Sequence, residues 1–150
     1  MPLAALEHAR LRPPSLETDL ASYLADSGDW GLDIDFEVSI NGQLVSRPPY
    51  SSMYWSPAQM LAHMTVNGAS LRTGDLFGSG TVSGPQRDQY GSMIELTWAG
   101  RDPLVLPDGS SRAWLEDGDE IVITASAPGP DGSRIGFGDV HGQIIPAWPA

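Results

Sequence analysis

Strict alternation of apolar and polar side chains marks the clearest strand in the sequence. In residues 33–40 (DIDFEVSI) every second residue is apolar, so one face of a strand would be buried and the other solvated. Asn41-Gly42 follows directly, and this dipeptide is the strongest short signal for a β-hairpin because both residues accept a positive φ. The pattern predicts a hairpin whose return strand covers residues 43–46.

Apolar residues at helical spacing predict two helices. Ser56-Pro57-Ala58-Gln59 offers a capping serine, a proline at the first helical position and a glutamine three residues after the cap. This helix is expected to end at Asn67-Gly68, since glycine commonly follows a helix in a left-handed conformation. Its apolar stripe consists of Met60, Leu61 and Met64. A second, shorter helix is predicted over residues 16–25, where the spaced apolar residues are Leu16, Leu20, Tyr23 and Leu24.

Turn signals alternate with short apolar runs through the second half of the chain. The expected strands are 94–98 (with Ile94, Leu96 and Trp98 on one face), 120–124, 134–137 and 143–145. The expected turns are Asp108-Gly109, the acidic segment 116–119 and Pro130-Asp131-Gly132. This density of turns favours a mainly β (α+β) fold with one central helix.

Composition narrows the possible functions. The chain has 150 residues, which suits one domain, and its net charge is -11, which argues against nucleic-acid and anionic-membrane partners. It contains no cysteine, and its eight basic residues are all arginine, so disulfides, thiolate chemistry and lysine Schiff bases are excluded. No apolar run is long enough to span a membrane and no signal peptide is recognisable, so the expected location is the cytoplasm.

Two segments are candidates for chemistry, and each has two interpretations. Residues 78–84 (GSGTVSG) do not match a phosphate-binding loop; they predict either a tight β connection or a backbone that approaches a ligand. In the second case the hydroxyl groups available to the ligand are those of Ser79, Thr81 and Ser83. Glu95 interrupts an apolar run, so its carboxylate is directed either to solvent or into a site where it assists a base.

The remaining titratable residues indicate no metal site. The three histidines, His8, His63 and His141, form no metal-binding pair, and His63 is interpreted as a structural, hydrogen-bonded residue. A first acidic group, Asp33, Asp35 and Glu37, is predicted to lie on the solvated face of a strand. A second, Asp117, Asp119 and Glu120, does not match an EF-hand and is interpreted as an acidic turn.

The motifs together resemble a known family. In chain order they are 32–35 (LDID), 53–55 (MYW), 66–68 (VNG), 71–76 (LRTGDL), 78–84 (GSGTVSG), 90–96 (YGSMIEL), 115–121 (LEDGDEI), 134–138 (RIGFG) and 142–147 (GQIIPA). The chain resembles the C-terminal portion of the fumarylacetoacetase family, most closely from about residue 32 onward. The pattern in 71–84 is shared by the wider fumarylacetoacetate hydrolase superfamily, whereas 53–55 and 66–68 are more specific.

The resemblance implies a hydrolase that cleaves the carbon–carbon bond of a β-diketo acid, fumarylacetoacetate, to fumarate and acetoacetate in tyrosine and phenylalanine catabolism. It implies a homodimer in which a divalent metal, Ca²⁺ or Mg²⁺, stabilises an enolate, while a histidine–glutamate pair activates water. Glu95 matches the catalytic glutamate that orients the histidine. Thr81 matches the threonine that binds a substrate carboxylate. The implied fold is part of a mixed β-sandwich roll.

The chain also departs from the family pattern. The catalytic histidine, the metal ligands and an active-site lysine lie upstream of the matched stretch, so no metal ligand is assigned in this chain. We therefore expect residues 1–31 to be a peripheral segment and 32–150 to be a catalytic-domain fragment that lacks the SH3-like domain and is inactive alone. The alternatives are an acylpyruvate hydrolase or decarboxylase of the same superfamily, and a non-catalytic module that pairs with a complete or complementary chain.

Overall fold

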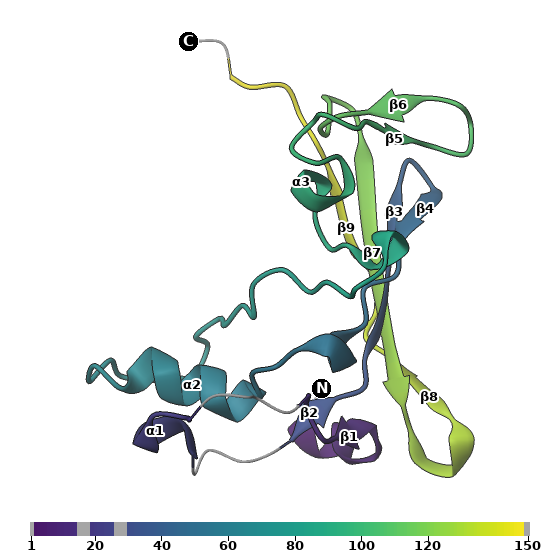
Figure 1. Ribbon diagram of the computed structural model, residues 1–150. Helices are drawn as coiled ribbons and strands as arrows, with labels where there is room; N and C mark the ends of the chain where they lie inside the picture. The colour runs from purple at the N-terminus through teal and green to yellow at the C-terminus, as the bar shows by residue number, and fades with distance from the viewer. Residues whose placement is uncertain (1, 15–18, 26–29, 149–150) are drawn as a thin grey trace.

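A computed structural model describes residues 2–14, 19–25 and 30–148. Within them one five-stranded sheet and two two-stranded sheets are accompanied by short helices, in agreement with the mainly β class predicted from the sequence. The long strand β7 (Glu120–Pro128) runs through the molecule, and the helices α1 (Ser22–Ala25) and α2 (Pro57–Thr65) project to one side of it (Figure 1). No helix in these described ranges is long and apolar enough to cross a membrane.

The other elements are short. The remaining strands are β1 (Arg10–Leu11), β2 (Gly31–Leu32), β3 (Asp35–Ile40), β4 (Gln43–Ser46), β5 (Leu104–Val105), β6 (Ser111–Arg112), β8 (Arg134–Gly136) and β9 (Val140–Gln143). The remaining helices are α3 (Met93–Leu96) and the 3₁₀ helices η1 (Leu3–Ala9), η2 (Tyr50–Ser52), η3 (Arg87–Gln89) and η4 (Pro130–Gly132).

Strand β7 organises the five-stranded sheet, in which all pairings are antiparallel. On one side it pairs with β3 from Asp35↔Ser126 to Ile40↔Ile121. On the other side β9 pairs with its first half and β8 with its last three residues. Strand β4 completes the sheet beyond β3, so the order is β4-β3-β7-β8, with β9 also on β7. Two segments about 80 residues apart in sequence are therefore adjacent in the sheet.

The predicted hairpin is confirmed. Asn41 has a φ of 52° and Gly42 a φ of 74°, the positive values that a tight hairpin turn requires. The return strand β4 has the predicted bounds, whereas β3 begins at Asp35, two residues after the predicted start. The turn also contacts β7, because the Asn41 backbone N–H donates to the Glu120 carbonyl over 2.8 Å.

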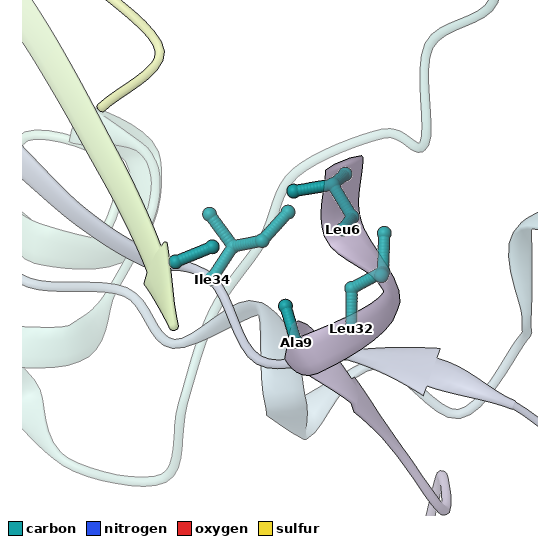
Figure 2. Packing of buried hydrophobic residues seen from close by; sticks show 5 residues of the cluster. Leu6, Ala9, Leu32 and Ile34 are labelled. Atoms are coloured by element: carbon teal, nitrogen blue, oxygen red, sulfur yellow. The ribbon is translucent and has the colours of Figure 1, made fainter. Parts of the chain in front are cut away.

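The buried core lies at one end of β7. Figure 2 shows Leu6, Ala9, Leu32 and Ile34 directed toward one another, and Ala127 of β7 completes the cluster. Leu6 and Ala9 belong to η1, which packs on β7, so part of the segment 1–31 contributes to this core. The division of the chain at residue 32 stays a prediction.

Helix α2 begins as predicted. The Ser56 hydroxyl accepts a hydrogen bond from the Gln59 backbone N–H over 3.0 Å, and the Gln59 side chain accepts one from the Ser56 N–H over 2.9 Å. The two bonds form a capping box, which satisfies two donors that a helix start leaves free. The helix ends at Thr65, and Gly68 follows with a φ of 87°. Of the helix residues it is Gln59 that is buried, whereas Leu61 and Met64 are exposed.

We expect the substitution Ser56→Ala to lower the free energy of unfolding by about 1–2 kcal/mol, because it removes a buried cap. Urea denaturation of the variant measures this change. Ser70→Ala, in an exposed loop position, is the matched control and should leave stability nearly unchanged. Equal stability of the Ser56 variant and the wild type would contradict the capping role.

Three sequence-based boundaries are corrected. Residues 94–98 do not form a strand: 93–96 form the helix α3, and the supposed common face is not buried, since Ile94 and Trp98 are exposed. The last strand is β9, Val140–Gln143, which precedes the predicted 143–145 and overlaps it at one residue. Only Ser22–Ala25 of the predicted helix 16–25 is helical, and residues 16–18 lie outside the described ranges.

A buried carboxylate fastens the β3–β4 hairpin to the start of β7. Asp119 is 2% exposed and accepts hydrogen bonds from the Arg112 guanidinium (2.9 Å to Oδ2) and from Asn41 Nδ2 (2.8 Å to Oδ1). The Glu116 backbone N–H donates to Oδ2 over 2.8 Å. These hydrogen bonds, led by those from Arg112, hold the pKa of Asp119 well below its usual value, although burial opposes the shift. The acidic turn thus contains a structural ion pair.

Candidate active site

Glu95 lies on α3, a single helical turn whose N-cap is Ser92. The Ser92 hydroxyl accepts a hydrogen bond from the Glu95 backbone N–H over 3.4 Å, which is the contact of an N-cap. Leu96 and Thr97 are buried beneath the turn. The helix then ends because Trp98, Ala99 and Gly100 all have positive φ. This short, anchored turn gives Glu95 a defined backbone position.

The Glu95 carboxylate is half-buried and receives two hydroxyl donors. Ser83 Oγ donates to Oε2 over 2.8 Å, and Ser92 Oγ donates to the same oxygen over 2.7 Å. One donor comes from the loop of residues 78–84 and the other from the helix cap. Of the two interpretations of Glu95, the one in which it simply points into solvent does not describe this arrangement.

The loop of residues 78–84 forms neither helix nor strand and is tied to its surroundings at its end. The Ser83 hydroxyl accepts from the Gly91 N–H over 3.1 Å, and the Ser83 carbonyl accepts from the Ser52 hydroxyl over 2.7 Å. A Cβ at Gly91 would overlap the carbonyl oxygen of Val82, so only glycine permits the two segments to approach this closely. The close backbone approach joins two segments of this chain.

Thr81 lies two residues before Ser83 and is exposed. Its methyl carbon is among the atoms nearest to the position that a Cβ at Gly91 would occupy. Thr81 and Glu95 are therefore connected through Ser83 and Gly91, which places both predicted site residues at one junction between the loop and α3. The junction therefore carries an exposed hydroxyl, which can donate to a substrate, and a carboxylate, which can orient a base.

Two hollows lie along the loop and the α3 segment, and the second of them is lined by the junction residue Gly91. One, of about 490 Å³, extends between α1, α2 and the start of the loop; its lining includes Tyr23, Trp55, Met60, His63, Gly78 and Ser79. The other, of about 190 Å³, lies between the sheet and the α3 segment; its lining includes Val38, Gly91, Ser92, Met93, Leu96 and Ile121. The predicted apolar stripe of α2 thus contributes to the wall of a hollow rather than to the core.

Two of the histidines bond to residues away from this junction. His63 Nδ1 is 3.0 Å from the Tyr23 hydroxyl, with which it also stacks, in line with its structural interpretation. His141 Nε2 is 3.3 Å from a carboxylate oxygen of Glu120. His8 lies on η1 and is exposed. In the described parts of the chain, none of the three forms a hydrogen bond or ion pair with Glu95.

The acidic residues of β3 pair with arginines. Asp35 bonds to Arg134 Nη2 over 2.6 Å, and Glu37 bonds to Arg47 Nε over 3.1 Å. Both carboxylates are exposed, as the strand pattern predicts. Across the described residues, no group of three or more histidine, cysteine, aspartate or glutamate side chains could hold a metal ion.

Sequence reasoning missed the part played by Ser92. The segment Ser92-Met93-Ile94-Glu95 has the S-x-x-E spacing that marks a helix start, and this signal was available in the sequence. The apolar residues Ile94, Leu96 and Trp98 alternate with other residues, and this alternation suggested a strand instead. Over only five residues, the same alternation also fits a single helical turn in which Leu96 is buried and Ile94 and Trp98 are exposed. The correct helix places the hydroxyl of Ser92 on the carboxylate of Glu95.

Comparisons with known proteins extend these observations. A family profile described as "Fumarylacetoacetate (FAA) hydrolase C-terminal" matches residues 7–145. Proteins named fumarylacetoacetase from Arabidopsis thaliana and Homo sapiens are each 39% identical to the chain in an alignment of 153 positions, gaps included. This alignment covers 98% of the chain. The Caenorhabditis elegans protein of the same name is 44% identical over 133 residues. The chain spans about 36% of the length of the first two relatives.

Proposed function

Since this chain belongs to the fumarylacetoacetate hydrolase C-terminal family, we propose that it supplies part of the active site of a metal-dependent hydrolase of β-diketo acids. The proposed reaction adds water across a carbon–carbon bond of fumarylacetoacetate and releases fumarate and acetoacetate. The observation that supports it is the half-buried Glu95 carboxylate, held by two serine hydroxyls at the junction that also carries Thr81.

Each of the two residues has a distinct task in this proposal. Glu95 accepts a hydrogen bond from a histidine that acts as general base, and its negative charge stabilises the histidinium that forms when the base takes a proton from water. Thr81 donates its exposed hydroxyl to a carboxylate of the substrate. The proposal assigns the base to a residue outside these 150, because His8, His63 and His141 have other surroundings.

The family's divalent metal does not fit the described residues of this chain. No cluster of three acidic or histidine side chains exists among them that could hold it. In the proposal the ion, Ca²⁺ or Mg²⁺, is held by residues outside this chain and would act as a Lewis acid on the diketone.

The proposal also covers the assembled enzyme, which is a cytoplasmic homodimer. In each subunit this chain forms the later part of a mixed β-sandwich roll.

A second candidate function is a module that pairs with a complete or complementary chain. Large apolar side chains are exposed on several elements: Leu76 is 98% exposed, and Trp98 and Val140 are each 68% exposed. Pairing with another chain would bury such side chains. Size-exclusion chromatography with light scattering separates this candidate from the first, because a chain that stays monomeric beside a complete subunit would exclude the pairing.

A chimeric enzyme tests the proposed function. The matching C-terminal region of the Arabidopsis thaliana relative is replaced by this chain, and turnover of fumarylacetoacetate is followed by absorbance. We expect hydrolysis by the chimera and none by the 150-residue chain alone, because Glu95 without its base cannot activate water. Acylpyruvates serve as competing substrates.

Each outcome of this experiment distinguishes the alternatives. A folded chimera that cleaves acylpyruvates but not fumarylacetoacetate would favour the related hydrolase or decarboxylase chemistry. A folded chimera with no activity would contradict the proposal, and so would turnover by the chain alone. Circular dichroism establishes folding in each case.

A further inference from the structure

We propose that Ser83 and Ser92 are positioning residues that together hold the Glu95 carboxylate by one oxygen and leave the other free for a catalytic partner. The inference rests on the proposed function, since that function assigns Glu95 its task. It goes further because it names two residues, from two different segments, that determine how the carboxylate is presented. The evidence is the direction of each hydrogen bond at this junction.

The two hydroxyl protons are both directed at Glu95. A serine hydroxyl has one proton to donate. Ser83 Oγ accepts from the Gly91 N–H over 3.1 Å, and Ser92 Oγ accepts from the Glu95 N–H over 3.4 Å. With a backbone donor already on each oxygen, the single proton of each hydroxyl lies on the bond to Oε2, at 2.8 Å and 2.7 Å. A carboxylate oxygen has the lone pairs to accept both of these bonds.

The two donors reach the oxygen from different supports. The Ser83 carbonyl lies 2.7 Å from the Ser52 hydroxyl, which shares its single proton between this carbonyl and that of Pro49 at 2.8 Å. Ser92 is fixed as the N-cap of α3. Because Glu95 is on the helix and Ser83 is on the loop, the bond between them spans 12 residues of sequence. One donor alone would let the carboxylate rotate about its bond, whereas two restrict it.

The other oxygen is left for a partner. Within the described residues, the hydrogen bonds to the Glu95 side chain both end on Oε2. Oε1 therefore keeps its full capacity to accept, and its direction is set once Oε2 is held. A base that must be oriented to within a fraction of an ångström needs such a fixed acceptor, since small misplacements can lower a rate roughly 100-fold.

Nuclear magnetic resonance of the full 150-residue chain tests the positioning directly. Three-bond couplings report the χ1 rotamer of Glu95. We expect a single rotamer in the wild type and averaged couplings in Ser83→Ala and in the Ser83→Ala/Ser92→Ala double variant. Ser83→Thr and Ser92→Thr keep the hydroxyl and should restore the single rotamer. Ser70→Ala, on the same connection between α2 and η3, is the matched control.

A kinetic measurement in the chimeric enzyme separates positioning from a merely structural role. Loss of the Ser83 hydroxyl should lower kcat about 10-fold to 100-fold with little change in KM, and Ser83→Thr should recover most of it. A single Glu95 rotamer in the double variant would overturn the proposal. So would an unchanged kcat when the rotamer is lost. If the chimera with both serines is inactive, the proposed function fails, while the couplings still decide whether the serines hold Glu95.

Discussion

Replacement of Asp119 by alanine is expected to lower the free energy of unfolding by about 3 kcal/mol. Asp119 is buried, and its two oxygens accept from Arg112, from Asn41 and from the backbone of Glu116. The variant removes both acceptor oxygens at once. It leaves the Arg112 guanidinium, whose side chain is only 18% exposed, without its closest partner. An unsatisfied donor in a buried position costs far more than the hydrogen bond gained on folding.

Urea denaturation measures this loss, and Asp117→Ala is the matched control. Asp117 is an exposed aspartate two residues earlier in the same turn. Its replacement should change the free energy of unfolding by less than about 0.5 kcal/mol. For a chain of this length, 3 kcal/mol corresponds to a fall in Tm of roughly 6–12 °C. A similar, small effect of both substitutions would show that the Asp119 network does not stabilise the fold.

The effect of Asp119→Ala should depend on pH in one direction. The pKa of Asp119 is held below its usual value in the folded chain, so the unfolded chain binds the proton more readily. The stabilisation is therefore complete above the unfolded value of about 4 and is lost as the pH falls below it toward the folded value. The difference between wild type and variant should be constant from about pH 5.5 to 8 and should shrink below about pH 4.

The substitution Glu95→Gln is expected to lower kcat of the chimeric enzyme by a factor of about 10² to 10⁴. Glutamine has nearly the same shape, and its carbonyl oxygen can still accept from Ser83 and Ser92. It lacks the negative charge, so it cannot stabilise the histidinium that forms when the base takes a proton from water. KM should change little, because in the proposal Thr81 rather than Glu95 binds the substrate.

Steady-state kinetics with fumarylacetoacetate checks this expectation. Glu7→Gln is the matched control, since Glu7 is an exposed glutamate that forms an ion pair with Arg10, three residues later in the chain. The control should retain nearly full activity. A Glu95→Gln enzyme with wild-type kcat would show that the charge of Glu95 has no part in the reaction, whatever its hydrogen bonds.

Local signals predicted the parts of the fold whose partners are close in sequence. The Asn41-Gly42 turn and the Ser56 capping box depend on residues within four positions of one another, so they are legible without tertiary information. The failure at 94–98 has the same origin. The local sequence there is compatible with both a strand and a helix start. The helix buries Leu96 and Thr97, and this burial depends on how the α3 segment lies against the sheet, which the local sequence does not reveal.

Contacts between distant residues could not be predicted in this way. Asn41 and Asp119 are 78 positions apart, and no spacing rule indicates that the carboxylate of an acidic turn is buried. The hydrogen bond from Ser83 to Glu95 joins two segments 12 residues apart, with the 3₁₀ helix η3 between them, and no spacing rule pairs the two residues. Glu95 and Thr81 themselves were assigned through the family resemblance, and the structure adds the serines that connect them.

The pairing of β3 with β7 has a consequence for how the molecule can open. Everything between Ser46 and Asp119, including α2, the loop and α3, leaves the sheet after β4 and returns to it at β7. Its two ends are fastened by the sheet and by the Asn41–Asp119 bond. Between these ends it is joined to β4 by the bonds from Ser46 Oγ to the Tyr90 carbonyl and from the Asp108 N–H to Gln43 Oε1. Opening the excursion breaks these contacts but no strand pairing of the five-stranded sheet, so we expect its amide hydrogens to exchange at a lower free energy than those of the sheet.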